Sequence, residues 1–231
     1  MNIAMILGAG TGSRMGKTPL PKQFMLIKNK PLMVYSLEVF QNHSDIDEII
    51  IVTSNDYISE VKKWCELYHL TKVKAVISGG NTRQKSVYNG IKYLESINTD
   101  EQANLLIHDG ARPNITDEII SRNIEACNKF HAVNTVIPCS DTISKSIDGK
   151  TILEIQKRSE QYQGQTPQTF KFGIIKKAHQ EALKKPNLEV TDDCLLVKNI
   201  NHDVYLVQGS KLNFKITTQE DILFFEALLN H

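Results

Sequence analysis

The sequence contains few cysteines and has no excess of charge of either sign. Its four cysteines, at positions 65, 127, 139 and 194, are far apart and form no C-x-x-C pair. This spacing argues against both a zinc site and a disulfide framework, so we expect free thiols. Lys and Arg number 27 against 26 Asp and Glu, which gives a formal net charge of +1. We therefore expect no binding to nucleic acid or to a membrane surface, and any anionic ligand must be bound by local basic residues.

Long apolar runs are also absent from the chain. No stretch approaches the roughly 18 residues that a membrane span needs, and no signal-peptide pattern begins the sequence. We therefore expect a cytoplasmic protein. The 231 residues are enough to bury a self-sufficient core, and no repeat or low-complexity linker divides them. The sequence predicts a single domain over residues 1–231.

Short apolar runs alternate with segments of helical spacing. We expect strands at seven runs: Ile3–Leu7, Glu48–Thr53, Lys74–Ser78, Asn104–His108, Ala132–Pro138, Asp203–Val207 and Asn213–Thr217. We expect helices at five segments: Pro31–Asn42, Tyr57–Tyr68, Arg83–Ile97, Asp117–Phe130 and Gly173–Lys184. This alternation predicts an α/β fold, a Rossmann-like and mostly parallel sheet with helices on both faces.

The segment from about 139 to 165 interrupts this alternation. It reads as two short polar strands around Asp148-Gly149, which is a hairpin signal and does not form a βαβ unit. We expect a β-arm that protrudes from the domain. Such an arm often contacts a second subunit, although a solvated hairpin without a partner fits the same pattern.

The first strand is followed by LGAGTGSRMG, a glycine-rich loop. Glycines at positions 8, 10 and 12 allow close approach of the backbone to a ligand, and Arg14 adds positive charge. These features predict phosphate binding. A dinucleotide-binding oxidoreductase is an alternative, but Ser13 stands where that fingerprint needs its third glycine. The loop also fails the Walker A spacing, and two prolines follow where a helix would begin.

Further basic and acidic residues follow the next strands. PLPKQF presents Lys22 from a loop stiffened by prolines, and SGGNTRQKS joins paired glycines to Arg83. HDGARP places Asp109 and Arg112 after the strand at 104–108. Ligands of parallel α/β sheets bind at the carboxyl ends of the strands, so these residues can meet at one site. An aspartate there commonly binds a Mg²⁺ ion that bridges phosphates, although it can also simply pair with arginine.

Taken together, the motifs resemble those of a known family. LGAGTGSRMG, LPKQF, GGNTRQKSVYNG, LLIHDGARP, DTI, GQTPQTF, TDDC and NFKITT occur in the order found in cytidylyltransferases that act on sugar-alcohol phosphates. The resemblance extends from Ile3 to about Leu223. It implies a nucleotidyltransferase fold and a reaction in which CTP and a polyol phosphate give a CDP-polyol and pyrophosphate, with Mg²⁺ required.

The resemblance also implies roles for particular residues. Arg14 and Lys22 would be catalytic and would stabilise the charged transition state, and Asp109 would meet the metal. CTP would be bound by residues of the two glycine-containing loops: Leu7, Gly8, Ala9, Gly10, Gly79, Gly80, Asn81, Thr82, Arg83, Gln84, Lys85 and Ser86. The polyol phosphate would be bound by residues from later in the chain: Arg112, Thr142, Arg158, Thr166, Thr191 and Lys215.

The family also implies a homodimer with shared active sites. The arm would cross to the second subunit, where Thr142, Arg158 and Thr166 complete the acceptor pocket. The motifs do not all favour the same acceptor. ILGAG, LPKQF, AVNTVIP, YQGQTPQTF and the cysteine of TDDC favour ribitol 5-phosphate, whereas HDGARP and TRQKSVYNG favour 2-C-methyl-D-erythritol 4-phosphate. We expect ribitol 5-phosphate, with methylerythritol phosphate as the alternative. A non-catalytic nucleotide sensor is disfavoured because both Arg14 and Lys22 are present.

Overall fold

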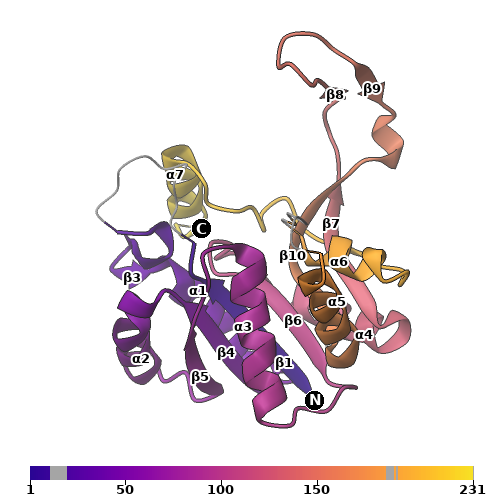
Figure 1. The fold of residues 1–231 in the computed structure, drawn as a ribbon. Helices are drawn as coiled ribbons and strands as arrows, with labels where there is room; N and C mark the ends of the chain where they lie inside the picture. Colours follow the sequence, from indigo (N-terminus) through magenta and orange to yellow (C-terminus); the bar gives the residue numbers. More distant parts are fainter. Residues whose placement is uncertain (11–19, 186–189, 191, 231) are drawn as a thin grey trace.

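The computed structural model describes residues 1–10, 20–185, 190 and 192–230, and its centre is one seven-stranded sheet (Figure 1). The strand order is β11-β7-β10-β6-β1-β4-β5. All neighbouring pairs are parallel except those of β10, which runs antiparallel between β6 and β7. The bounds of these strands are β1 Asn2–Gly8, β4 Glu48–Thr53, β5 Val73–Ser78, β6 Asn104–Asp109, β7 Ala132–Pro138, β10 Tyr162–Lys171 and β11 Tyr205–Gln208.

The predicted mostly parallel sheet is confirmed, and its central strands are buried on both faces. In β1, Ile3 and Met5 point into one core cluster, while Ala4 and Ile6 point into the other. Successive side chains of a strand lie on opposite faces, so a continuous apolar run requires helices above and below the sheet. The apolar strands of this sequence therefore fit a sheet that is covered by helices on both faces.

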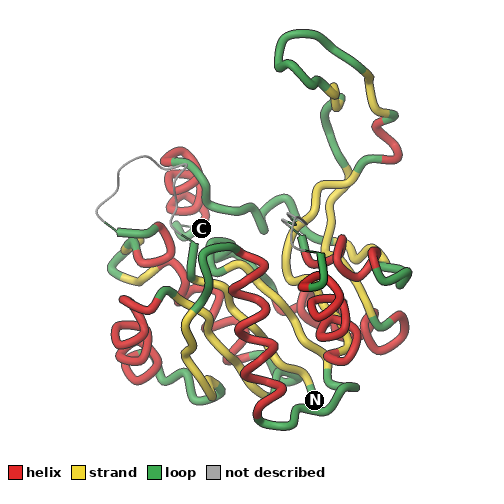
Figure 2. The backbone as a smooth tube through the Cα atoms, in the orientation of Figure 1, coloured by secondary structure: helices red, strands yellow, loops and turns green. Residues whose placement is uncertain are grey.

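Helices cover both faces, as predicted (Figure 2). The first core cluster packs under α3 (Arg83–Ser96), α5 (Phe172–Leu183) and α6 (Asp193–Asn199). The second packs under α1 (Leu32–Asn42), α2 (Ile58–Leu67) and α4 (Asp117–Phe130). Five of these helices fall at predicted segments, whereas α6 and the C-terminal helix α7 (Gln219–Leu228) were not predicted.

Among the described residues, one predicted strand is absent, and one strand of the sheet was not predicted. The run Asn213–Thr217 forms no strand; its backbone crosses the carboxyl edge of the sheet, where the Ile216 N–H donates to the Ala111 carbonyl. It connects β11 to α7, which packs through Ile222 and Phe225 near a small hairpin of β2 (Leu26–Ile27) and β3 (Lys30–Pro31). Conversely, β10 was not predicted as a sheet strand, because its residues are mostly polar.

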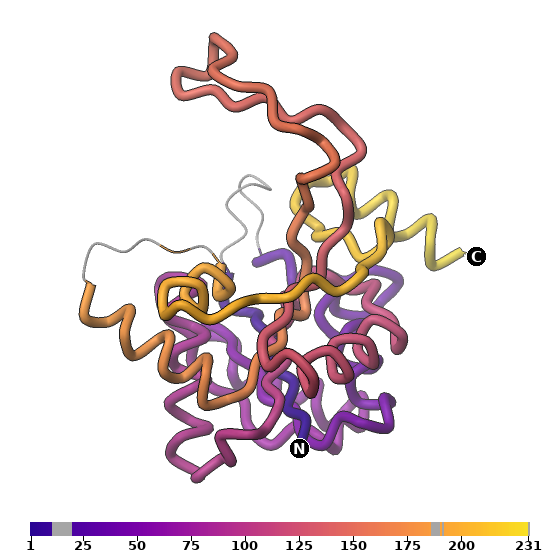
Figure 3. Tube along the Cα trace, turned by 90° about the vertical axis from the view of Figure 1, so that its right-hand side faces the viewer, coloured from indigo at the N-terminus to yellow at the C-terminus, as the bar shows by residue number. Residues whose placement is uncertain are grey.

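The predicted β-arm protrudes from the body and is seen clearly in two views (Figures 1 and 3). It carries a two-stranded sheet of β8 (Ile143–Lys145) and β9 (Glu154–Gln156), and a single 3-10 turn follows at Arg158–Glu160. Four large apolar side chains of the arm are more than half exposed: Ile147, Ile152, Leu153 and Ile155. The arm therefore presents an apolar surface that this chain does not cover.

None of the helices in the described part of the chain has the length and apolar character needed to cross a membrane.

Candidate active site

The first wall of the site is the loop that leaves β1. The buried side chain of Gln23, on the 3-10 turn Lys22–Phe24, donates its amide to two carbonyl oxygens of this loop. Its Nε2 lies 2.5 Å from the Gly8 oxygen and 2.8 Å from the Gly10 oxygen. One amide group therefore holds two carbonyl groups of the backbone at the point where the chain leaves the sheet.

The second wall is the loop between β5 and α3. A Cβ added to Gly79 would lie 2.5 Å from the Ala9 Cβ and 2.9 Å from the Ser86 Oγ. Glycine at 79 thus allows the two loops to touch. Thr82 caps α3 by accepting from the Lys85 N–H at 3.1 Å, and the Gly80 N–H donates to Ser86 Oγ at 3.1 Å. The amino end of a helix with free N–H groups favours a bound anion.

Asp109 ends β6 and lies between two basic side chains. Its carboxylate accepts from Arg83 Nε at 3.4 Å and from Lys215 Nζ at 2.6 Å. Burial alone would raise the pKa of this carboxyl, but Arg83 and Lys215 hold the pKa well below its usual range. Asp109 is therefore ionised at neutral pH, and it joins the second loop to the segment that carries Lys215.

Arg83 is held from behind by a buried carboxylate. Its Nη1 donates to Asp193 Oδ2 at 2.5 Å, and Asp193 lies 3.0 Å from the ring of His179. Gln168 adds a longer contact to Arg83 at 3.5 Å and donates to Asp192 at 2.8 Å. Burial disfavours the charged forms of Asp193 and Arg83. Their ion pair outweighs this effect, so the pKa of Asp193 is lowered and its carboxylate stays ionised. The TDDC motif thus fixes the direction of the Arg83 guanidinium.

Lys22 approaches the same region from the other side. Its side chain is only 9% exposed, and its Nζ donates to the Ile216 carbonyl at 2.6 Å. The ammonium group therefore lies against the segment that carries Lys215. Arg83 and Lys215 contact Asp109, and Lys22 adds a third cation beside the segment that carries Lys215.

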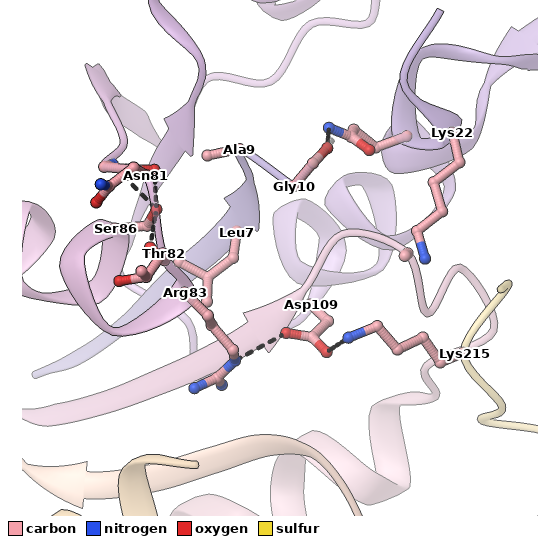
Figure 4. Close-up of a pocket in the computed structure, with 13 residues that line it drawn as sticks. Leu7, Ala9, Gly10, Lys22, Asn81, Thr82, Arg83, Ser86, Asp109 and Lys215 are labelled. Carbon is pink, nitrogen blue, oxygen red and sulfur yellow. Dashed lines mark hydrogen bonds and ion pairs between the residues drawn. The ribbon is translucent and has the colours of Figure 1, made fainter. Parts of the chain in front are cut away.

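These groups border a cavity of about 320 Å³ at the carboxyl edge of the sheet (Figure 4). Figure 4 shows Arg83, Asp109 and Lys215 along one side, and Lys22 opposite Asn81, Thr82 and Ser86. The lining comprises Leu7, Ala9, Gly10, Lys22, Gln23, Gly80, Asn81, Thr82, Arg83, Ser86, Asp109, Ala111 and Lys215.

A second cavity of about 480 Å³ adjoins the first. Arg112, Lys211 and Lys215 bring three cations to its lining, and Lys215 borders both cavities. Arg112 is held in place by two backbone carbonyls, those of Asn213 at 2.8 Å and Gly164 at 3.3 Å. The pair of cavities is suited to two anionic ligands that meet near Lys215.

The structure does not bring all the predicted residues to these cavities. Of the residues assigned to CTP, four do not border the first cavity: Gly8, Gly79, Gln84 and Lys85. Gly8 instead leaves room for the Met33 sulfur, which would lie 2.7 Å from an added Cβ. Thr166 is buried next to Asp109, and its hydroxyl forms hydrogen bonds with the Asp109 N–H and with the ring of His108. Arg14 and Thr191 lie outside the described residues.

The two predicted residues of the arm are also remote from the cavities of their own chain. Thr142 and Arg158 are exposed, and neither borders a cavity described above. In the described part of the chain, the side chain of Arg158 donates to the Ser140 carbonyl at 3.4 Å. If these two residues bind substrate, they must do so in another subunit.

Sequence reasoning missed several residues that organise the site. Gln23, Asp193 and His179 were not among the predicted site residues, yet each holds part of the lining in place. Gln23 could have been found from its position beside Lys22 in LPKQF. Asp193 stands in TDDC, but nothing in the local sequence shows that it pairs with Arg83, 110 residues away. His179 lies within a helix and carries no local signal.

Fold and site together define a class of protein. A parallel sheet whose carboxyl edge carries two touching loops, a helix amino end and clustered cations is typical of proteins that bind nucleotide phosphates. The family model described as IspD, 2-C-methyl-D-erythritol 4-phosphate cytidylyltransferase, matches residues 2–231. The chain therefore belongs to the 2-C-methyl-D-erythritol 4-phosphate cytidylyltransferase family, and it is a CTP-dependent nucleotidyltransferase.

Individual relatives agree with this family. The chain is 40% identical over 228 residues to the 2-C-methyl-D-erythritol 4-phosphate cytidylyltransferase of Clostridium botulinum strain Langeland, covering 99% of this chain and 97% of that protein. It is similar to the solved 4-diphosphocytidyl-2C-methyl-D-erythritol synthase of Anaerococcus prevotii, with 32% identity, a TM-score of 0.84 and coverage of 100% and 96%. The solved 2-C-methyl-D-erythritol 4-phosphate cytidylyltransferase of Thermus thermophilus gives 27% identity, a TM-score of 0.78 and coverage of 98% of each chain.

The predicted cytidylyltransferase is thus confirmed. The preference for ribitol 5-phosphate is not supported, because the family and these relatives are named for methylerythritol phosphate. The oxidoreductase and sensor alternatives are wrong, because the family is one of cytidylyltransferases.

Proposed function

We propose that this enzyme transfers the cytidylyl group of CTP to 2-C-methyl-D-erythritol 4-phosphate. The observation that carries the proposal is the family match over nearly the whole chain, joined to a relative at 40% identity with the same substrate in its name. Motifs of both groups reach the cavity walls, so the proposal rests on the family match. AVNTVIP, which favoured ribitol, contributes Ile137 and Pro138 to the second cavity, and YQGQTPQTF contributes Gln163, Gly164 and Gln165, whereas Cys194 lies outside both cavities. HDGARP, which favoured methylerythritol phosphate, contributes Asp109, Ala111 and Arg112 to the cavity walls.

In this proposal the first cavity binds CTP. The amino end of α3 and the loop at Gly10 face the triphosphate. The end of the helix supplies N–H donors, and the loop leaves room for phosphate oxygens. The second cavity binds the phosphate of the acceptor among Arg112, Lys211 and Lys215. An arrangement of this kind neutralises the charge of both reactants before they meet, which lowers the cost of bringing two anions together.

The reaction is then a direct displacement at phosphorus. An oxygen of the acceptor phosphate forms a bond to the α-phosphorus of CTP, while the bond from that phosphorus to the bridging oxygen breaks and pyrophosphate leaves. Lys22, fixed by the Ile216 carbonyl, and Lys215, which borders both cavities, stabilise the charge that develops in this step. Arg14 is assigned the same task by the family motif. No covalent enzyme intermediate is required.

The side chains of the site can hold a divalent cation only together with phosphate oxygens of the substrate. Within residues 1–10, 20–185, 190 and 192–230, no three His, Cys, Asp or Glu side chains are arranged to hold a metal ion. Mg²⁺ is commonly bound by one or two carboxylates together with phosphate oxygens and water. Asp109 is the carboxylate that borders the first cavity. We assign it to Mg²⁺ bound to the CTP phosphates, where the ion would further neutralise their charge.

The functional unit in this proposal is a homodimer. Thr142 and Arg158 are carried on the protruding arm, away from the cavities of their own chain. The exposed apolar side chains of the arm, such as Ile147 and Ile155, favour burial against another protein surface. A second copy that receives the arm would bring Thr142 and Arg158 to its acceptor cavity.

Pyrophosphate release tests the proposal. The purified protein is incubated with CTP and Mg²⁺, together with either 2-C-methyl-D-erythritol 4-phosphate or ribitol 5-phosphate. We expect rapid release with the methylerythritol compound and at least about tenfold lower kcat/KM with ribitol phosphate, a preference of about 1.4 kcal/mol. Higher kcat/KM with ribitol phosphate would reverse the substrate assignment.

A further inference from the structure

His108 is a fully buried histidine with no role in the proposed reaction so far. It lies on β6 next to Asp109, and its ring packs 5.2 Å from the ring of Phe40. Its Nε2 is 3.0 Å from the Arg112 carbonyl oxygen and its Nδ1 is 3.1 Å from Thr166 Oγ1. Both partners of the ring are uncharged, a carbonyl and a hydroxyl, and a fully buried charge without a charged partner is costly, so the ring is neutral.

The two hydrogen bonds determine which ring nitrogen carries the proton. A carbonyl oxygen can only accept, so Nε2 must donate to the Arg112 carbonyl. In the neutral ring Nδ1 then has a lone pair and must accept. The hydrogen bond to Nδ1 is therefore donated by the hydroxyl of Thr166.

This assignment commits the only proton of the Thr166 hydroxyl. The same oxygen accepts from the Asp109 N–H at 3.1 Å. The side chain is 4% exposed, and it borders neither of the two cavities. Thr166 therefore has no proton left to donate to a phosphate oxygen of the acceptor.

The hydroxyl replaces a missing backbone partner at the end of the sheet. The pairing of β10 with β6 reaches Gln168 opposite Ile107 and goes no further toward Asp109. A backbone N–H buried without an acceptor is costly, so the Asp109 N–H needs another partner there. The Thr166 side chain supplies it, and His108 fixes the direction of that hydroxyl.

We propose that His108 and Thr166 are positioning residues, which hold the backbone of Asp109 so that its carboxylate faces Arg83 and Lys215. This role rests on the proposed function, because it serves the same cavity. It also replaces the expectation that Thr166 binds the polyol phosphate directly. Thr166 acts on the reaction through Asp109 and does not touch the acceptor.

The tautomer of His108 can be measured without any substrate. Protein labelled with ¹⁵N-histidine is examined by two-bond ¹H–¹⁵N correlation near neutral pH, and the signal of His108 is assigned from its loss in His108→Gln. We expect a neutral ring protonated at Nε2. In Thr166→Val, the Nδ1 resonance should move as its hydrogen bond is lost. A ring protonated at Nδ1 would overturn the proposal, because the hydroxyl of Thr166 would then be free to donate.

Steady-state kinetics tests the positioning role. Thr166→Val should lower kcat about tenfold, while KM for the acceptor stays within about twofold, because an interaction with bound acceptor is not removed. Thr166→Ser keeps the hydroxyl and should recover kcat to within about threefold. A rise in acceptor KM of about tenfold with kcat retained would show that Thr166 contacts the acceptor and would overturn the proposal.

The same strand offers a matched control. Thr169 is also buried in β10, and its hydroxyl donates to Asn123 Oδ1 at 3.0 Å, away from the cavities. Thr169→Val should lower the unfolding temperature about as much as Thr166→Val and leave kcat unchanged. Equal loss of kcat in both variants would reduce the effect of Thr166 to stability and contradict the proposal. If the wild-type enzyme does not use the acceptor at all, the proposed function fails, whereas the tautomer measurement still decides whether Thr166 can donate.

Discussion

The two hydrogen bonds of the Gln23 amide predict a measurable link between loop geometry and CTP binding. Gln23→Met keeps the side-chain volume and removes both bonds, so the Gly8 and Gly10 carbonyl oxygens lose a donor. The Gly8 oxygen is buried, with a long contact of 3.5 Å from the Thr53 hydroxyl, whereas Gly10 is exposed to water. A buried acceptor left without a partner costs about 1–3 kcal/mol, so we expect a total loss of about 2 kcal/mol.

In a chain of this size, that loss lowers the unfolding temperature by about 4–8 °C. Because the freed loop forms the wall of the first cavity, KM for CTP should rise at least about fivefold, or about 1 kcal/mol. Gln41→Met is the matched control: Gln41 also makes two hydrogen bonds, to Thr71 and Lys72, but it lies outside the cavities. It should lower the unfolding temperature and leave KM unchanged. An unchanged KM in Gln23→Met would show that CTP binding does not depend on these two hydrogen bonds.

Four further predictions concern the charged residues of the site and the arm. Lys22→Met should lower kcat by about 10²-fold or more, and survival of turnover within a few-fold would exclude Lys22 as the stabilising charge. Asp193→Asn should raise KM for CTP and lower the unfolding free energy by roughly 3 kcal/mol, because Arg83 loses the buried one of its two carboxylate partners. The pKa values of Asp109 and Asp193 are lowered in the folded protein, so as pH falls the unfolded chain binds these protons before the folded protein does. The free energy of unfolding, measured in urea, should therefore be at its full value near neutral pH and should decline as pH falls below about 4. A constant free energy of unfolding down to about pH 3 would contradict these shifts. Mixed dimers of Lys22→Met and Arg158→Ala subunits should regain activity if the arm serves the partner's site, whereas confirmed mixed dimers without activity would place each site within one chain.

Strands and helices with a strong local pattern could be predicted from the sequence. Apolar runs such as Glu48–Thr53 have the composition of strands buried on both faces, and this alone indicates helices above and below them. The strand β10 could not be predicted in this way. Its residues Thr166, Gln168 and Thr169 are polar, and their burial is made possible by partners on β6, β7 and α4 that are distant in the sequence.

The opposite error occurred at Asn213–Thr217, where a strand was expected from a short apolar run. Pairing with a neighbouring strand, which local pattern does not specify, is absent there among the described residues; Asn213 instead bonds through its side chain to the Thr166 carbonyl at 2.8 Å. The same distinction holds for the site. Glycine loops and single charges could be predicted from motifs, whereas the support of Arg83 by Asp193 depends on the tertiary fold.

We have proposed that this cytidylyltransferase selects methylerythritol phosphate as its acceptor. The most direct measurement is a competition in which the enzyme receives CTP, Mg²⁺ and equal concentrations of 2-C-methyl-D-erythritol 4-phosphate and ribitol 5-phosphate. The CDP products are then separated and identified by mass. We expect CDP-methylerythritol to form in at least about tenfold excess. A product that is mainly CDP-ribitol, or no CDP product at all, would contradict the proposal.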